Sequence, residues 1–144
     1  MRALVVAWAF TGVACATIRP PDLDELKPTV EAFHQRVRWK DFRSAADLVV
    51  PEHRDAFIKA RSTSNDERDL SITDFQLEDA KLSPDRGAAL AVSKISWYRL
   101  PSSTETTATV TSTFVWRENT WYLESQDTGP FEDLRPAPAP APVR

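Results

Sequence analysis

The middle of the chain holds five side chains of types that transfer protons: His34, Asp41, Asp47, His53 and Tyr98. Such groups act as general acids or bases when burial moves their pKa toward the working pH. His34 is the best candidate, because it lies four residues after Val30 and borders the apolar face of an expected helix. His53 is expected to be exposed. No second group is spaced to pair with His34, so a histidine that only packs at a helix edge is the simpler interpretation.

Cys15 is the other reactive side chain and the only cysteine, so it has no disulfide partner within the chain. It follows Met1, Arg2 and the uncharged apolar run ALVVAWAFTGVA. Twelve residues rise about 18 Å as a helix, well short of the ~30 Å hydrocarbon core of a bilayer. The segment is therefore interpreted as a targeting signal rather than a membrane span.

The sequence Gly12-Val13-Ala14-Cys15 resembles the end of a bacterial lipoprotein signal. The resemblance implies that residues 1–15 form the signal peptide and that the Cys15 thiol carries lipid, which makes the bilayer a partner. Ala16 resembles the second mature residue of lipoproteins sent to the outer membrane, so the expected location is its periplasmic face. The alternative is ordinary secretory cleavage after the A-x-A-like residues 14–16, which leaves a secreted or periplasmic protein without Cys15.

Composition and charge narrow the remaining choices. The chain has 144 residues, 42% hydrophobic and 27% charged, as expected of one folded domain. Its net charge of −3 disfavours nucleic acid and anionic membrane surfaces as partners. Two separated histidines make no metal cluster, and none of the three glycines lies in a phosphate-binding motif. We therefore predict neither a metal nor a cofactor.

Periodicity divides the mature chain into a tether, a domain and a tail. Residues 16–28 are polar and interrupted by proline, which predicts a tether, and residues 29–126 carry the periodic apolar pattern of a folded domain. Residues 127–144 are predicted to be a proline-rich disordered tail. Its end, RPAPAPAPVR, favours polyproline II and is interpreted as a spacer, a reach toward the cell wall, a ligand for a proline-binding module, or a solvated tail without a partner.

The first half of the domain is predicted to be helical. A helix over residues 29–40 is expected to begin at Thr29 as its N-cap. A second helix is expected over residues 42–49 with Asp41 as its cap, and a third from Pro51 to about residue 61. Residues 62–69 lack apolar periodicity and are interpreted as a connection.

The second half is predicted to form four antiparallel strands over residues 70–82, 88–100, 104–117 and 120–126. The alternation of the first strand slips between Ile72 and Phe75, which predicts a bulge or bend. Glu118 and Asn119 are expected to form the last hairpin turn. The fold class is therefore α+β, with N-terminal helices packed on a curved four-stranded antiparallel sheet.

This order of elements resembles the NTF2-like (SnoaL-like) cone fold. The resemblance rests also on the aromatic residues flanking the last hairpin in FVWRENTWYLES and on the stretch from Trp39 to Phe42. It implies a conical cavity between helices and sheet, which family members use for catalysis, for ligand binding or as a scaffold. Five aromatic residues are expected either to fill the core or to line a pocket: Trp39, Trp97, Phe114, Trp116 and Trp121.

Two hypotheses about function follow. The first is a membrane-anchored envelope lipoprotein whose domain is a non-catalytic module that binds an envelope protein or a small apolar ligand. The alternative is a small cone-fold enzyme of the isomerase, dehydratase or hydrolase type that uses His34 as acid or base.

Overall fold

A computed structural model describes residues 19–136 of the chain. The predicted signal peptide with Cys15 and the end of the proline-rich tail lie outside these residues. The described part begins with a 3₁₀ turn at Leu23–Glu25, followed by α1 (Leu26–Arg38), α2 (Phe42–Ala46), a 3₁₀ turn at Pro51–His53, α3 (Arg54–Thr63) and α4 (Asp66–Asp69). Four strands follow: β1 (Leu70–Leu82), β2 (Ala88–Arg99), β3 (Thr106–Arg117) and β4 (Thr120–Gln126).

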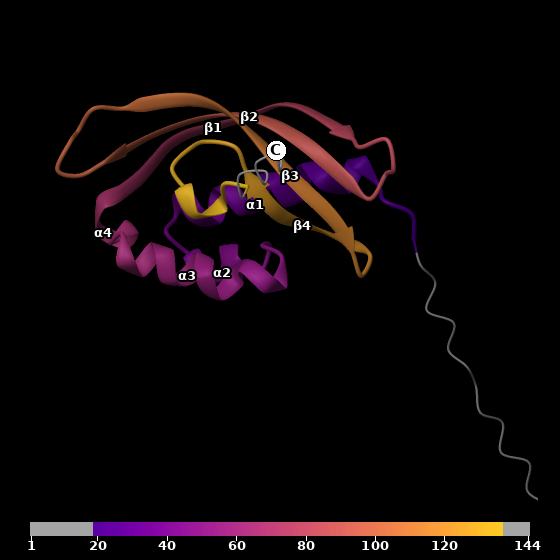
Figure 1. The fold of residues 1–144 in the computed structure, drawn as a ribbon. Coiled ribbons are helices and arrows are strands. Elements are labelled where there is room, and N and C mark those ends of the chain that lie inside the picture. Colours follow the sequence, from indigo (N-terminus) through magenta and orange to yellow (C-terminus); the bar gives the residue numbers. More distant parts are fainter. Residues whose placement is uncertain (1–18, 137–144) are drawn as a thin grey trace, which may run out of the picture.

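The four strands pair in sequence order, β1-β2-β3-β4, and every pair is antiparallel. The sheet arches over the helices and over the C-terminal 3₁₀ turn at Glu132–Leu134, which lie on its concave side (Figure 1). The structure confirms the α+β class and the antiparallel meander. It also confirms the bulge, since the β1–β2 register shifts between Ile72 and Asp74. A second shift, between Leu77 and Asp79, was not expected from the sequence.

Local chemistry explains the turns and helix ends. Glu118 and Asn119 both have positive φ, 50° and 61°, as a two-residue hairpin turn with the right twist requires. Asp41 caps α2, because its carboxylate accepts from the amide of Ser44. The cap assigned to Thr29 was wrong: α1 begins at Leu26, and the Thr29 hydroxyl donates to the Glu25 carbonyl within the helix.

The folded unit is longer at both ends than the sequence indicated. Leu26 is fully buried within the residues interpreted as tether, and Pro28 fits the first turn of α1, where an amide has no partner in any case. The indole nitrogen of Trp121 donates to the Asp22 carbonyl at 2.7 Å. Past the predicted boundary at residue 126, Phe131 is buried in the core. Each of these terminal segments has too few apolar residues in the sequence to show a helical or a strand periodicity.

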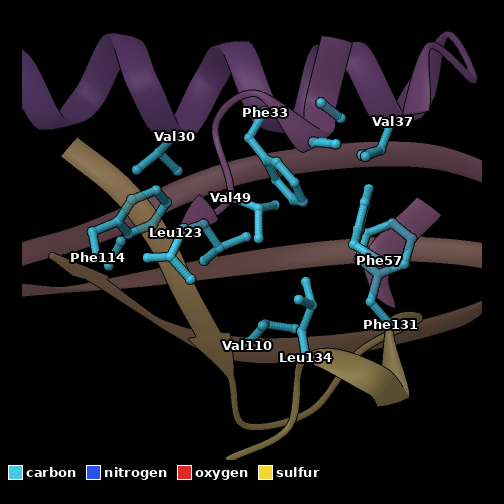
Figure 2. Packing of buried hydrophobic residues seen from close by; sticks show 14 of the residues in the cluster. Val30, Phe33, Val37, Val49, Phe57, Val110, Phe114, Leu123, Phe131 and Leu134 are labelled. Atoms are coloured by element: carbon cyan, nitrogen blue, oxygen red, sulfur yellow. The ribbon is translucent and has the colours of Figure 1, made fainter. Parts of the chain in front are cut away.

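The core lies between α1 and the concave face of the sheet. Figure 2 shows Val30, Phe33 and Val37 pointing from α1 toward this interior. Three phenylalanine rings meet there, with centroids 6.0 Å apart for Phe33–Phe57, 6.1 Å for Phe33–Phe131 and 5.8 Å for Phe57–Phe131. The two contacts of Phe131 are edge-to-face, and such contacts stabilise the core beyond the area that each ring buries. The interior of the cone is therefore occupied by side chains from α1, α3 and the C-terminal segment.

Phe131→Ala tests whether the C-terminal segment belongs to the core. We expect the free energy of unfolding to fall by about 3–5 kcal/mol, because the substitution removes a fully buried ring and leaves a cavity. Chemical denaturation measures the loss. Its neighbour Glu132 is exposed, so Glu132→Ala should change stability by less than ~0.5 kcal/mol. Equal small effects of both substitutions would show that the segment is not part of the folded unit.

Candidate functional site

His34 lies on α1 with 1% of its surface exposed, stacked on Phe75 of β1. The two ring centroids are 3.9 Å apart, and the ring planes differ by 12°. Its Nδ1 is 2.9 Å from the Val30 carbonyl, so Nδ1–H donates to that oxygen. In the neutral ring Nε2 then carries a free lone pair, and this nitrogen is buried without a hydrogen-bond partner among the described residues.

Burial lowers the pKa of His34 to about 4, and the hydrogen bond to the Val30 carbonyl opposes this only in part. The side chain is therefore neutral at pH 7. A neutral imidazole with one nitrogen already donating can accept one further hydrogen bond at Nε2. The site offers a buried acceptor.

A groove of about 470 Å³ runs beside His34, between α1 and the beginning of β1. Its walls combine apolar and aromatic side chains with a charged rim, and the lining residues are Glu31, His34, Gln35, Arg38, Trp39, Ser71, Ile72 and Phe75. The volume lies within the range of small-ligand sites. Trp39 is 76% exposed, an unusual state for so large an apolar side chain. The exposed indole of Trp39 and the buried side chain of His34 therefore line the same groove.

The other four proton-transfer candidates do not line this groove. Asp41 is the cap of α2, and hydrogen bonding from Ser44 lowers its pKa. His53 is exposed, with Nδ1 3.3 Å from the Glu124 carbonyl. Asp47 is exposed and Tyr98 is half-buried on β2. The carboxylate that does line the groove, Glu31, was not recognised from the sequence, because an exposed glutamate one turn before His34 carries no distinguishing pattern.

The five aromatic candidates are distributed over four regions. Phe114 and Trp121 are buried in the core. Trp116 is half-buried at the last hairpin, edge to face with Trp121 at 5.1 Å, and its indole nitrogen donates to the Arg19 carbonyl. Trp97 lines a different cavity, of about 770 Å³, near the C-terminal segment. Only Trp39 joins His34, so the structure does not gather the five into one pocket.

An ionic cluster lies at the end of the sheet near Trp97 and was missed by the sequence reasoning. Arg61 and Asp66 are 5% and 1% exposed, and the Nε of Arg61 is 3.0 Å from Oδ2 of Asp66. Arg99 donates to the other oxygen of Asp66, and Arg61 donates to Asp133. Asp66 lies in residues 62–69, which were interpreted as a connection because they lack apolar periodicity.

Two further findings concern the described residues. Within residues 19–136, no helix has the length and apolar character needed to cross a bilayer. The same residues hold no group of three or more His, Cys, Asp or Glu side chains arranged to bind a metal ion.

Comparison with known proteins identifies the fold. No protein-family model matches the chain, and no curated protein matches it. Among solved structures, it is similar to a SEC-C motif containing protein from Rhodopseudomonas palustris, with a TM-score of 0.56, 14% identity, and 68% of this chain and 73% of that chain covered. The β subunit of benzoate 1,2-dioxygenase from Burkholderia mallei gives a TM-score of 0.52, with 8% identity and coverage of 76% and 90%.

Aln2 from a Streptomyces species is similar at a TM-score of 0.51 and 13% identity, covering 75% of this chain and 91% of that chain. The dioxygenase subunit and Aln2 are NTF2-like cone folds. The domain therefore has an NTF2-like cone fold, as expected from its sequence. At these identities the similarity establishes the fold alone.

The pKa of His34 predicts a specific dependence of stability on pH. Between about pH 4 and pH 6.5, His34 is protonated in the unfolded chain and neutral in the folded protein. The free energy of unfolding therefore falls as pH drops from 6.5 to 4, by about 3 kcal/mol in total, and levels off for this group below 4. Hydrogen bonds from Ser44 and Arg68 lower the pKa values of Asp41 and Asp69, so their contributions are lost only below 3.8.

Denaturation of the wild type and His34→Leu at several pH values measures this effect. The variant should lose the slope between pH 6.5 and 4 and keep the steeper loss at lower pH. An unchanged slope in the variant would assign the titration to other groups.

Proposed function

We propose that this protein is an envelope lipoprotein anchored through Cys15 whose cone domain binds a small, largely apolar ligand in the groove beside His34. The observation that carries the binding role is the exposed indole of Trp39 in a groove with a buried, unpaired acceptor at its side. An exposed tryptophan and an unsatisfied buried nitrogen both cost free energy in the free protein. A ligand that covers the Trp39 indole and donates a hydrogen bond to Nε2 of His34 removes both of these costs.

The chemistry of the groove selects the ligand. Ile72, Phe75 and Trp39 offer apolar contact, while the long side chains of Gln35 and Arg38 form a flexible rim. We place a ligand N–H or O–H against Nε2 of His34, because His34 lines the groove and this nitrogen has no partner among the described residues. A ligand with an apolar body and one donor therefore fits best.

The pKa of His34 supports a binding role over proton transfer. A general base works best with a pKa near the operating pH, and burial holds that of His34 at about 4. Its lone pair accepts a hydrogen bond well and takes a full proton poorly. The interior of the cone is also occupied by Phe33, Phe57 and Phe131. The small-enzyme alternative would have to use the open groove instead.

N-Phenyl-1-naphthylamine tests the groove, since it is apolar, carries one N–H and fluoresces on entering an apolar site. We expect binding to the wild type and about tenfold weaker binding to Trp39→Ala, the effect of losing roughly 1.4 kcal/mol of aromatic contact. Leu100→Ala is the control, because Leu100 is exposed at 43% and does not line the groove. Equal weakening by both substitutions would place the dye elsewhere.

The N-methylated form of the same dye tests the acceptor. It should bind the wild type more weakly than the N–H dye, by about fivefold for one lost hydrogen bond. In His34→Leu the difference between the two dyes should vanish. A difference that persists in His34→Leu would show that Nε2 accepts nothing from the ligand.

The anchor has its own test. Cells expressing the protein and fed an alkyne-labelled fatty acid should label the wild type and the control Thr17→Ser, whereas Cys15→Ser should carry no label, because the thiol is the attachment point proposed from the signal. Label that remains on Cys15→Ser would refute the anchor. So would a mature chain that begins at Thr17, as measured by mass spectrometry.

A further inference from the structure

A third cavity, of about 350 Å³, lies where the α1–α2 turn meets α3 and α4. Four cationic side chains line it from four places in the chain: Lys40 in the turn, Arg43 on α2, Arg61 on α3 and Arg68 on α4. Glu67 is the one carboxylate among its lining residues. This local excess of positive charge contrasts with the overall net charge of −3. None of these residues lines the groove beside His34.

Arg61 supplies an independent indication of a ligand. Its side chain is 5% exposed, and its Nη1 is buried without a hydrogen-bond partner among the described residues. The Nε lies 3.0 Å from Oδ2 of Asp66, an ion pair without a hydrogen bond, and Nη2 donates to Asp133. Nε and Nη2 share one edge of the planar guanidinium, so Nη1 points away from both carboxylates. Arg61 lines both this cavity and the 770 Å³ cavity, whereas Asp66 and Asp133 line only the 770 Å³ cavity.

The neighbouring cations are only partly neutralised. Arg68 is paired with Asp69 through contacts of 2.6 and 2.9 Å. Lys40 donates to the backbone carbonyl of Glu67 at 2.7 Å, which satisfies a hydrogen bond without cancelling the charge. Arg43 is exposed and makes no ion pair among the described residues. Converging like charges repel, and a buried N–H without an acceptor costs free energy.

We infer that this cavity binds the oxyanion group, a carboxylate or a phosphate, of a small soluble ligand. The oxyanion accepts from Nη1 of Arg61 and is held by Arg43 and Lys40, so it satisfies the buried donor and the uncompensated charge together. Phe42 and the half-exposed Ile58 give the rest of the ligand a short apolar contact. The ligand class therefore differs from that of the His34 groove, and the inference does not depend on the proposed function.

The test uses the whole mature protein with inorganic phosphate and acetate as separate probes, titrated at constant ionic strength against chloride. Two-dimensional NMR follows the Arg61 side-chain Nε–H and the backbone amides of Ser62 and Asn65, which also line the cavity. We expect saturable shifts at these groups with at least one probe, at millimolar concentration. If neither phosphate nor acetate gives saturable shifts up to ~50 mM, the inference is overturned, because binding that weak is not site-specific.

Charge-matched variants separate the site from general screening. Arg43→Gln should weaken binding about fivefold, as expected for one partly exposed ion contact. Lys59→Gln removes the same charge from an exposed position on α3 outside the cavity and should leave affinity unchanged. Equal weakening by both variants would overturn the site. Arg61→Gln leaves Asp66 buried with less compensation and is expected to unfold, so Arg43 carries the test.

Vesicles of phosphatidylglycerol distinguish the source of the oxyanion. The inference expects free phosphate or acetate to bind and vesicles to add nothing at the same phosphate concentration. Binding to vesicles without binding to either free anion would replace the soluble ligand with a lipid headgroup and so overturn the assignment.

Discussion

Arg61 on α3 pairs with α4 and with the C-terminal segment, whose Asp133 lies 72 residues further along the chain. Its guanidinium carbon lies 4.6 Å from the centroid of the Phe57 ring and 4.4 Å from that of Phe131, so the cation sits against both rings. The same group pairs with Asp66 and Asp133. It therefore connects α3, α4 and the C-terminal segment, and Arg99 extends the network to β2 through Asp66. Burial lowers the pKa of Arg61, an effect that the two aspartates oppose.

This arrangement explains why the cone is filled. Phe131 can enter the interior only if the chain turns back after β4, and the Asp133 carboxylate holds that return by pairing with Arg61. Inside the fold, the Phe131 ring contacts the rings of Phe33 and Phe57 edge to face. The space that a cone fold can offer to a ligand is then occupied by the protein itself. The open cavities argued above lie instead at the boundaries of the helical layer, one between α1 and β1 and the other beside the short helices.

The parts of the fold that could be predicted were those with a strong local signal. Alternation of apolar and polar residues identified the strands, and turn chemistry identified the hairpin at Glu118 and Asn119. Helical spacing placed His34 at the border of the apolar face of α1, and the structure buries it there. Its stacking on Phe75 and the role of Arg61 depend on contacts across roughly 40 and 70 residues of chain. The spacing of residues in the sequence contains no information about such contacts. Whether Trp39 lies in the core or on the surface depends likewise on how the end of α1 packs against the sheet.

The proposed anchor also has a geometric consequence. The Arg19 amide donates to Asn119, and the Arg19 carbonyl accepts from Trp116, which holds this residue at the last hairpin. Cys15 precedes Arg19 by four residues, a span of at most ~14 Å, so a lipid on that thiol keeps the hairpin within this distance of the bilayer. α1 starts beside the hairpin and rises about 20 Å over its 13 residues to Trp39. Trp39 of the groove and Lys40 of the cationic cavity therefore lie about one helix length from the start of α1.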